Sequence, residues 1–208
     1  MSDELEVPTK AEIACLEPFL GLPLERIFVP VTKDQLSAAM ADLVRCRFVG
    51  FDTESKPTFK KGEISDGPHV AQFATLHKAY IFQLHRIDCR EILARLLETT
   101  NLVKVGFGLK SDQSRLHSKF GIKPRAIIDL NTLFRSEGYR KEVGARGAVA
   151  IMFNQRFRKP RSVSTSNWAL LNLKSNQLLY AANDAYAALK VLLALKKQES
   201  ELPILGLN

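Results

Sequence analysis

The chain has 208 residues, of which 46% are apolar and 25% are charged, and its formal net charge is +8. This length suits one domain with its own hydrophobic core, and the composition excludes an intrinsically disordered chain. No apolar run reaches the roughly 18 residues that a membrane-spanning helix needs, and three cysteines are too few and too scattered for a disulfide framework or a zinc site. The acidic N-terminus lacks the apolar segment of a secretory signal, so we expect a cytoplasmic protein.

The predicted elements alternate between strands and helices. A T-x-x-Q capping box at Thr32 and Gln35 predicts a helix over 33–44, which precedes a buried strand over 47–54. Two apolar runs split by a short polar turn predict a hairpin over 69–84. The chain then continues with a helix over 88–98 capped by Asp88 and Glu91, a strand over 101–107, a helix over 111–121 capped by Ser111, a strand over 126–130, and helices over 144–153 and 175–197. This order predicts a three-layer α/β fold with a mixed central β-sheet flanked by helices.

Charge is unevenly distributed along the chain. Residues 1–25 hold six acids and one base, whereas residues 135–161 hold eight bases and two acids. A concentrated basic stretch is typical of proteins that bind nucleic acid, although a solvated loop can have the same composition. Phe153 and Phe157 lie within this stretch, where they either stack on bases or belong to the core beneath a loop.

Two acids end the strand predicted over 47–54. Because side chains alternate across a strand, Asp52 and Glu54 lie on the same face. Burying two neighbouring carboxylates is unfavourable unless a cation neutralises them, and a hard divalent ion prefers oxygen ligands. The alternative is a strand end that reaches solvent, where both acids are hydrated.

Two further acids stand in notable positions. Asp184 lies in a helical segment that is apolar almost all round, and Tyr180 precedes it by one turn on the same face. A structural Tyr–Asp hydrogen bond would also explain this pair. Asp112 follows a Gly-Phe-Gly turn and lies in the first turn of a predicted helix, where the helix dipole already favours a carboxylate.

If these four acids converge on one cleft, they can hold two divalent ions. Two such ions about 3.5–4 Å apart form a centre that cleaves phosphodiesters, because one activates water and the other stabilises the leaving oxygen. The chain has neither a G-x-S-x-G motif nor a P-loop, and its histidines lack the H-x-x-x-H ligand spacing. The acids are therefore the leading candidates for catalysis.

Three segments resemble, in the same order, the exonuclease motifs of the DEDD superfamily. They are FDTE (51–54), GFGLKSDQSRL (106–116) and SNWALLNLKSNQLLYAANDAYAAL (166–189), and the resemblance covers residues 30–197. The Tyr-x-x-x-Asp form of the last segment marks the tyrosine-containing branch. Within that branch the chain is most similar to Werner-type domains and to small, ribonuclease D-like bacterial exonuclease domains.

The resemblance implies an RNase H-like exonuclease fold over residues 30–200, with an acidic N-terminal extension (1–29) and a C-terminal tail (201–208). It implies metal-dependent 3′-5′ hydrolysis of single-stranded or frayed DNA or RNA, with release of nucleoside 5′-monophosphates. The implied cofactors are two divalent ions, Mg²⁺ or Mn²⁺. The implied catalytic residues are Asp52, Glu54, Asp112, Tyr180 and Asp184, of which the four acids bind metal.

The resemblance also implies a role for each of these residues. Asp52 would bridge both ions, and Glu54 and Asp184 would complete the first site. Asp112 would hold the second ion largely through water, and Tyr180 would orient or help to activate the attacking water. As contacts to nucleic acid we expect Arg146, Arg156, Arg158, Lys159, Arg161, Thr53 and Phe107.

Two other classes of function stay open at this point. One is a non-catalytic nucleic-acid-binding module that keeps the fold, which is disfavoured because none of the four acids is lost. The other is an RNase H-like endonuclease, which is disfavoured because the Tyr180–Asp184 pair is typical of the exonuclease branch. The sequence also leaves open whether copies of the chain assemble into a homo-oligomer.

Overall fold

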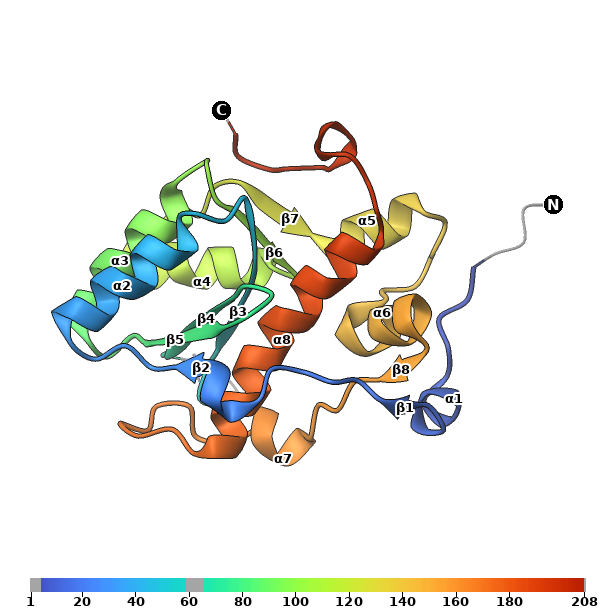
Figure 1. Cartoon of the computed structure of the whole chain (residues 1–208), viewed down its shortest axis with the longest axis horizontal. Helices are drawn as coiled ribbons and strands as arrows, with labels where there is room; N and C mark the ends of the chain where they lie inside the picture. Colours follow the sequence, from blue (N-terminus) through green and yellow to red (C-terminus); the bar gives the residue numbers. More distant parts are fainter. Residues whose placement is uncertain (1–4, 59–65, 208) are drawn as a thin grey trace.

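The computed structural model describes residues 5–58 and 66–207. Its helices are α1 (Lys10–Ala14), α2 (Lys33–Leu43), α3 (Ile87–Glu98), α4 (Lys110–Phe120), α5 (Leu130–Ser136), α6 (Gly144–Phe153), α7 (Arg161–Ser164) and α8 (Ser175–Ala194). Its strands are β1 (Glu17–Pro18), β2 (Ile27–Phe28), β3 (Phe48–Glu54), β4 (Val70–Ala74), β5 (Ala79–Gln83), β6 (Val103–Gly106), β7 (Ile127–Asp129) and β8 (Gln155–Arg156). Figure 1 shows their arrangement. Among the described residues, no helix is both long enough and apolar enough to cross a membrane.

The central sheet is mixed, as the sequence predicts. Its strand order is β2-β5-β4-β3-β6-β7. The strands β3, β4 and β5 pair antiparallel, whereas β6 lies parallel to both β3 and β7, and β2 lies parallel to β5. The predicted hairpin over 69–84 corresponds to β4 and β5. The expectation of an α/β fold with a mixed sheet flanked by helices is therefore confirmed.

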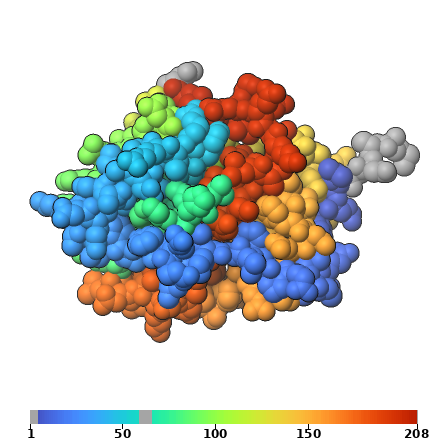
Figure 2. Space-filling view, viewed as in Figure 1, coloured from blue at the N-terminus to red at the C-terminus, as the bar shows by residue number. Residues whose placement is uncertain are grey.

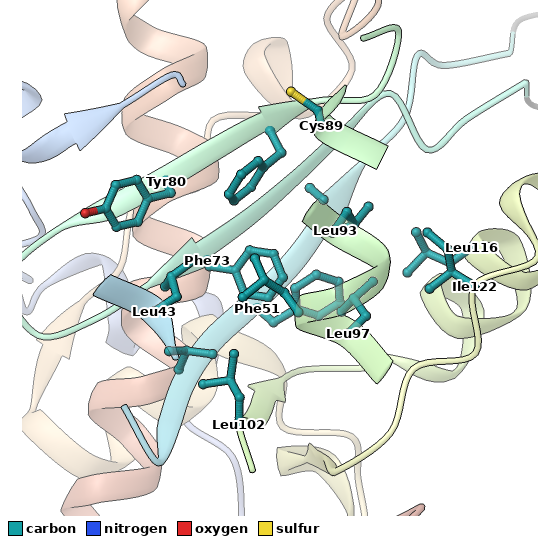
Figure 3. Packing of buried hydrophobic residues seen from close by; sticks show 14 of the residues in the cluster. Leu43, Phe51, Phe73, Tyr80, Cys89, Leu93, Leu97, Leu102, Leu116 and Ile122 are labelled. Carbon is teal, nitrogen blue, oxygen red and sulfur yellow. The ribbon is translucent and has the colours of Figure 1, made fainter. Parts of the chain in front are cut away.

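Alternating side chains divide the sheet into two buried faces. Phe51, Phe73 and Phe82 project to one face and pack against α2, α3 and α4, as Figure 3 shows for Phe51 and Phe73 beside Leu93 and Leu97. The opposite face packs against α8, which crosses the sheet in Figure 1 and contributes several alanines. The small alanine side chains let the helix backbone approach the strands closely, so this second face is where the sheet and α8 can share a site.

Of three predicted helix N-caps, the structure confirms one and contradicts two. The capping box of α2 forms as predicted, with Thr32 and Gln35 bonding each other's backbone. The predicted capping box of α3 does not form, because the helix begins one residue earlier and Asp88 lies within its first turn. Ser111 does not cap α4 either. Asp129, at the end of β7, instead accepts hydrogen bonds from the N–H groups of Gly108 and Leu109 at 3.0 Å each.

The described part of the acidic N-terminal segment packs against the basic stretch. The strand β1 pairs parallel with β8, and Figure 2 shows the N-terminal segment in blue lying across the orange region of the chain. The Phe19 ring lies 5.7 Å from the rings of both Phe153 and Phe157, centroid to centroid. Phe157 is only 6% exposed. Phe157 therefore belongs to the core and the half-buried Phe153 packs against it, so the alternative that Phe157 stacks on bases is not supported.

Candidate active site

The site begins where two neighbouring strands diverge. β3 pairs with β6 only over Phe48–Gly50, whereas its antiparallel pairing with β4 continues to Glu54. β6 ends at Gly106, whose backbone lies so close to β3 that a Cβ atom there would come within 2.5 Å of the Phe51 carbonyl oxygen. Beyond this point the chain turns away into α4. The second half of β3 therefore borders a crevice on its β6 side, and both of its acids lie in this half.

Close packing at a glycine brings α8 to the same place. A Cβ atom built on Gly50 would lie 1.7 Å from the carbonyl oxygen of Ala185, so only glycine permits this approach. Asp184 precedes Ala185 and is 4% exposed. A strand and a helix that are more than 100 residues apart in sequence thus present their carboxylates to each other.

Three of the four predicted acids form one cluster. A carboxylate oxygen from each of Asp52, Glu54 and Asp184 lies within 4.8 Å of the others. Ligand oxygens around one ion at about 2.0–2.6 Å lie at most about 5 Å apart, so the three residues fit a shared hard divalent cation. Asp112 adjoins the cluster, because its Oδ1 accepts a hydrogen bond from the hydroxyl of Thr53, which lies between the two β3 acids. The structure therefore brings three of the four predicted acids together, and Asp112 lies beside this cluster rather than in it.

Burial and mutual repulsion make these carboxyl groups reluctant to ionise. Burial, reinforced by the charges of Asp184 and Asp112, raises the pKa of Asp52 well above its ordinary value. Burial together with the charge of Asp52 raises the pKa of Glu54 to about 10. Burial also raises the pKa of Asp112. A cluster that must hold protons when no cation is present is well suited to bind divalent cations.

Lys159 supplies the positive charge next to the cluster. Its Nζ lies 2.7 Å from Oδ2 of Asp184. Burial raises the pKa of Asp184 to about 6, although the neighbouring Lys159 ammonium lowers it. For Lys159 itself burial lowers the pKa, but the charges of Asp184 and Asp52 outweigh this and raise it overall. The ammonium and the carboxylates therefore stabilise each other's charged forms.

Tyr180 stands beside this ion pair. The Lys159 ammonium lies 5.5 Å from the centre of the Tyr180 ring, and the ring also packs 5.9 Å from that of Trp168. Burial, with the charge of Asp184 added, raises the pKa of the Tyr180 phenol. Its hydroxyl is therefore protonated at neutral pH and able to hydrogen-bond, as the one-turn spacing from Asp184 predicts.

A cavity of about 310 Å³ opens over the acids. Its lining includes Asp52 and Asp184, the side chain of Lys159, and Phe107 with Gly108 from the β6–α4 turn. This volume is at the lower end of the range of small-molecule sites, which run from about 300 to 1,000 Å³. The predicted contact Phe107 thus lies in the cavity wall, where an aromatic ring can stack on a base.

The other predicted nucleic-acid contacts are placed differently from one another. Arg146 donates to the carbonyl oxygen of Lys159, and Arg156 donates to that of Ala14 at 2.5 Å, so both guanidinium groups hold backbone. Arg158 and Arg161 are exposed. The hydroxyl of Thr53 bonds Asp112, and Lys159 pairs with Asp184.

Sequence reasoning missed two features of the site. The first is Lys159 as the partner of Asp184, because the two residues meet only through the path of the basic stretch. The second is Gln72, which stands directly opposite Asp52 in the β3–β4 register and is fully buried. Within the described part of the chain, neither polar atom of its amide has a hydrogen-bond partner. A lone glutamine in the otherwise apolar strand VAQFA is the signal that could have pointed to it.

The far wall of the cavity links α5 to α6. The side-chain amide of Asn131 donates to Glu142 at 3.0 Å, and its oxygen accepts from the N–H of Gly144 at 3.3 Å. All three residues line the same cavity as Asp52 and Asp184. The start of α6 is therefore held in place by a side chain rather than by packing alone.

Comparison with known proteins gives a family and a fold. A family model described as 3′-5′ exonuclease matches residues 27–199. The chain is 29% identical over 170 residues to the bifunctional 3′-5′ exonuclease/ATP-dependent helicase WRN of Mus musculus, a match covering 75% of this chain and 12% of that protein. It is also 29% identical over 143 residues to a 3′-5′ exonuclease of Arabidopsis thaliana, which covers 68% of this chain and 50% of that protein. The chain therefore spans half or less of the length of these two relatives.

A solved structure shows the same fold. The Nibbler EXO domain of Aedes aegypti superposes with a TM-score of 0.72 at 24% sequence identity, covering 87% of this chain and 92% of that one. At this level of identity the likeness concerns the fold, and it agrees with the exonuclease architecture that the sequence motifs imply.

Proposed function

The chain belongs to the 3′-5′ exonuclease family, and we propose that it removes nucleotides one at a time from the 3′ end of single-stranded or frayed DNA or RNA. The observation that carries this proposal is the cluster of Asp52, Glu54 and Asp184, whose carboxylate oxygens lie within 4.8 Å of one another, with Asp52 and Asp184 lining a cavity. The cavity size suits one terminal nucleotide. Phe107 in its wall offers a surface for the base.

Exonucleases of this family use divalent metal ions, and the acid cluster fits them. We propose two ions, Mg²⁺ or Mn²⁺, with Asp52, Glu54 and Asp184 holding one and Asp52 with Asp112 holding the other. Bound there, the ions would lower the pKa of a water molecule and neutralise charge on the phosphate. An all-carboxylate donor set is the one that these hard cations prefer.

The protein's own residues then orient the reaction. Tyr180, protonated and next to Asp184, hydrogen-bonds the attacking water and points its lone pair at the terminal phosphorus. The water oxygen forms a new P–O bond as the bond from phosphorus to the 3′ oxygen of the preceding nucleotide breaks. The attacking water gives up one proton and the leaving 3′ oxygen takes up one, so the products are a nucleoside 5′-monophosphate and a strand one nucleotide shorter with a free 3′-hydroxyl.

We assign binding of the substrate backbone to the exposed part of the basic stretch. Arg158 and Arg161 are exposed, so they are free to reach phosphates of the incoming strand. Arg146 and Arg156 hold backbone carbonyls, and we assign them to keeping the stretch in shape. We place the protein in the cytoplasm, because its three cysteines are unpaired and a reducing compartment keeps them so.

Replacement of Asp52 is the direct test of the catalytic assignment. Asp52→Ala should abolish hydrolysis of a labelled oligonucleotide in Mg²⁺ or Mn²⁺, because it removes the proposed bridging ligand. It also removes a buried carboxyl group whose ionisation the neighbouring acids oppose, so the metal-free variant should melt at the same temperature as the wild type or higher. Near-normal turnover by the folded variant would refute the assignment.

A further inference from the structure

Lys159 occupies the place where a divalent ion would bind. Its ammonium lies 2.7 Å from Oδ2 of Asp184, and the Asp184 side chain is 3% exposed, against 27% for that of Lys159. The same ammonium lines the cavity together with Asp52. The contact is therefore a largely buried ion pair inside the acid cluster, unlike a surface salt bridge that water screens.

The backbone of Lys159 is held in place, and its ammonium is carried on a flexible four-carbon side chain. Its carbonyl oxygen accepts a hydrogen bond from the guanidinium of Arg146 on α6, and the next residue is Pro160, the N-cap of α7. Two helices thus anchor the residue on either side. The ammonium, on a flexible four-carbon stem, can move within the cavity but not away from it.

An ammonium and a divalent cation compete for the same carboxylate oxygen, which here is Oδ2 of Asp184. A metal ligated by Asp184 would lie about 2.0–2.6 Å from the oxygen, while the ammonium stands at a similar distance from it. The two positive charges would repel each other strongly at this distance, because the pair is largely buried. A divalent ion ligated by Oδ2 therefore displaces the Lys159 ammonium from this oxygen.

We propose that Lys159 is a tethered counter-ion that competes with the divalent ion for Asp184 and, once displaced, binds the terminal phosphate of the substrate. The inference rests on the proposed function, because it takes the acid cluster as the metal site. The displaced ammonium stays in the cavity that receives the terminal nucleotide, where the phosphate is the strongest acceptor for a compact cation. Lys159 thus neutralises part of the charge of the acids in the metal-free protein and part of the charge of the terminal phosphate once metal and substrate are bound.

Metal binding without substrate tests the first half of the inference. Calorimetric titration with Mn²⁺ alone should show that Lys159→Met binds the ion about tenfold more tightly than the wild type, since the competing charge is gone. Lys159→Arg keeps the charge and should bind Mn²⁺ within about twofold of the wild type. Arg158→Met is the matched control: it removes an exposed charge from the neighbouring position, and the Mn²⁺ affinity should not change. Unchanged or weaker Mn²⁺ binding by folded Lys159→Met would overturn the inference.

Kinetics at saturating Mn²⁺ test the second half. Lys159→Met should lower kcat/KM on a short single strand by about tenfold or more, because a charge-assisted contact to the phosphate is lost. An unchanged kcat/KM at saturating Mn²⁺ would overturn the assignment of Lys159 to the phosphate. If Mn²⁺ affinity responds as expected but even the wild type cleaves nothing, the proposed function fails while the competition at Asp184 stands. The two failures are thereby distinguishable.

Discussion

Asp52, Glu54 and Asp184 together carry more negative charge than the single ammonium of Lys159 can neutralise. Burial, with the charge of Asp52 added, raises the pKa of Glu54 to about 10, and burial raises the pKa of Asp184 to about 6 although Lys159 lowers it. Without a divalent ion the cluster binds protons in its place. Metal binding must therefore release protons, and the affinity for the ion should increase with pH through this range.

The proposed role of Tyr180 predicts how one substitution changes the kinetics. Tyr180→Phe should lower kcat by about 10- to 100-fold with little change in KM, because the lost hydroxyl acts only on the attacking water. Tyr186→Phe on the same helix is the matched control, since its ring packs 6.2 Å from that of Phe19. Steady-state kinetics on one labelled strand will distinguish them. If Tyr180→Phe raised KM and left kcat unchanged, the result would contradict the role on the attacking water and indicate a role in substrate binding.

A buried lysine elsewhere predicts how stability depends on pH. Lys104 on β6 is fully buried, and its ammonium donates to the carbonyl oxygens of Thr99 at 2.8 Å and Leu102 at 2.7 Å. Burial lowers its pKa from 10.5 to about 7. Between these two values the unfolded chain holds the proton more tightly than the folded protein, so this residue makes the free energy of unfolding rise with pH. Below pH 7 both states are protonated, and its contribution is a constant penalty.

Comparison with Lys104→Met isolates this contribution. Urea denaturation of both proteins at pH 7, 8 and 9 gives the difference in free energy of unfolding, wild type minus variant. That difference should increase by up to about 1.4 kcal/mol per pH unit, the limit for one proton. A difference that does not change with pH would contradict the lowered pKa of Lys104.

At the scale of elements, the packing of α8 on β3 determines whether the site forms. The carbonyl of Ala185 lies against Gly50, and the next residue toward the N-terminus is Asp184. Any side chain at position 50 must push the helix away and carry Asp184 with it. Stability and catalysis are thus coupled through one glycine.

Gly50→Ala should therefore reduce both the stability of the fold and the catalytic activity. We expect a loss of about 3 kcal/mol in the free energy of unfolding from overpacking, together with loss of activity in any protein that still folds. Gly121→Ala is the control, because Gly121 has a φ of +71° but no atom within 4 Å of its Cβ position. It should cost about 1 kcal/mol from backbone strain alone and leave kcat unchanged. Equal thermal stability of Gly50→Ala and the wild type would contradict the close approach of α8.

Local signals predicted some helix starts and not others for a physical reason. The capping box of α2 needs only Thr32 and Gln35, which are neighbours on one turn, so the sequence reveals it. The backbone N–H groups just before α4, those of Gly108 and Leu109, instead donate to Asp129, which belongs to the next strand. No pattern of nearby residues encodes that partner. The start of α5 is different: this helix was not predicted, although its N-cap is local, because Asp129 accepts a hydrogen bond from the N–H of Asn131 at 3.0 Å.

At the scale of the whole molecule, the site was predictable where the periodicity of a strand or a helix determines which side chains share a face. Strand alternation gave the shared face of Asp52 and Glu54, and helix spacing gave the pairing of Tyr180 with Asp184. The position of Lys159 was not predictable, because it depends on how β8 and α7 carry the basic stretch back to the acids. Charge alone indicated a nucleic-acid contact at this lysine. Only tertiary structure brings its ammonium to Asp184.

Digestion of matched linear and circular strands tests the central claim most directly. The wild type, with Mn²⁺ or Mg²⁺, should shorten 5′-labelled linear DNA or RNA stepwise from the 3′ end and release nucleoside 5′-monophosphates. A 3′-phosphate should block the reaction, a circular strand of the same sequence should stay intact, and Asp52→Ala should leave all substrates uncut. Cleavage of the circular strand as readily as the linear one would contradict the account and establish an endonuclease instead.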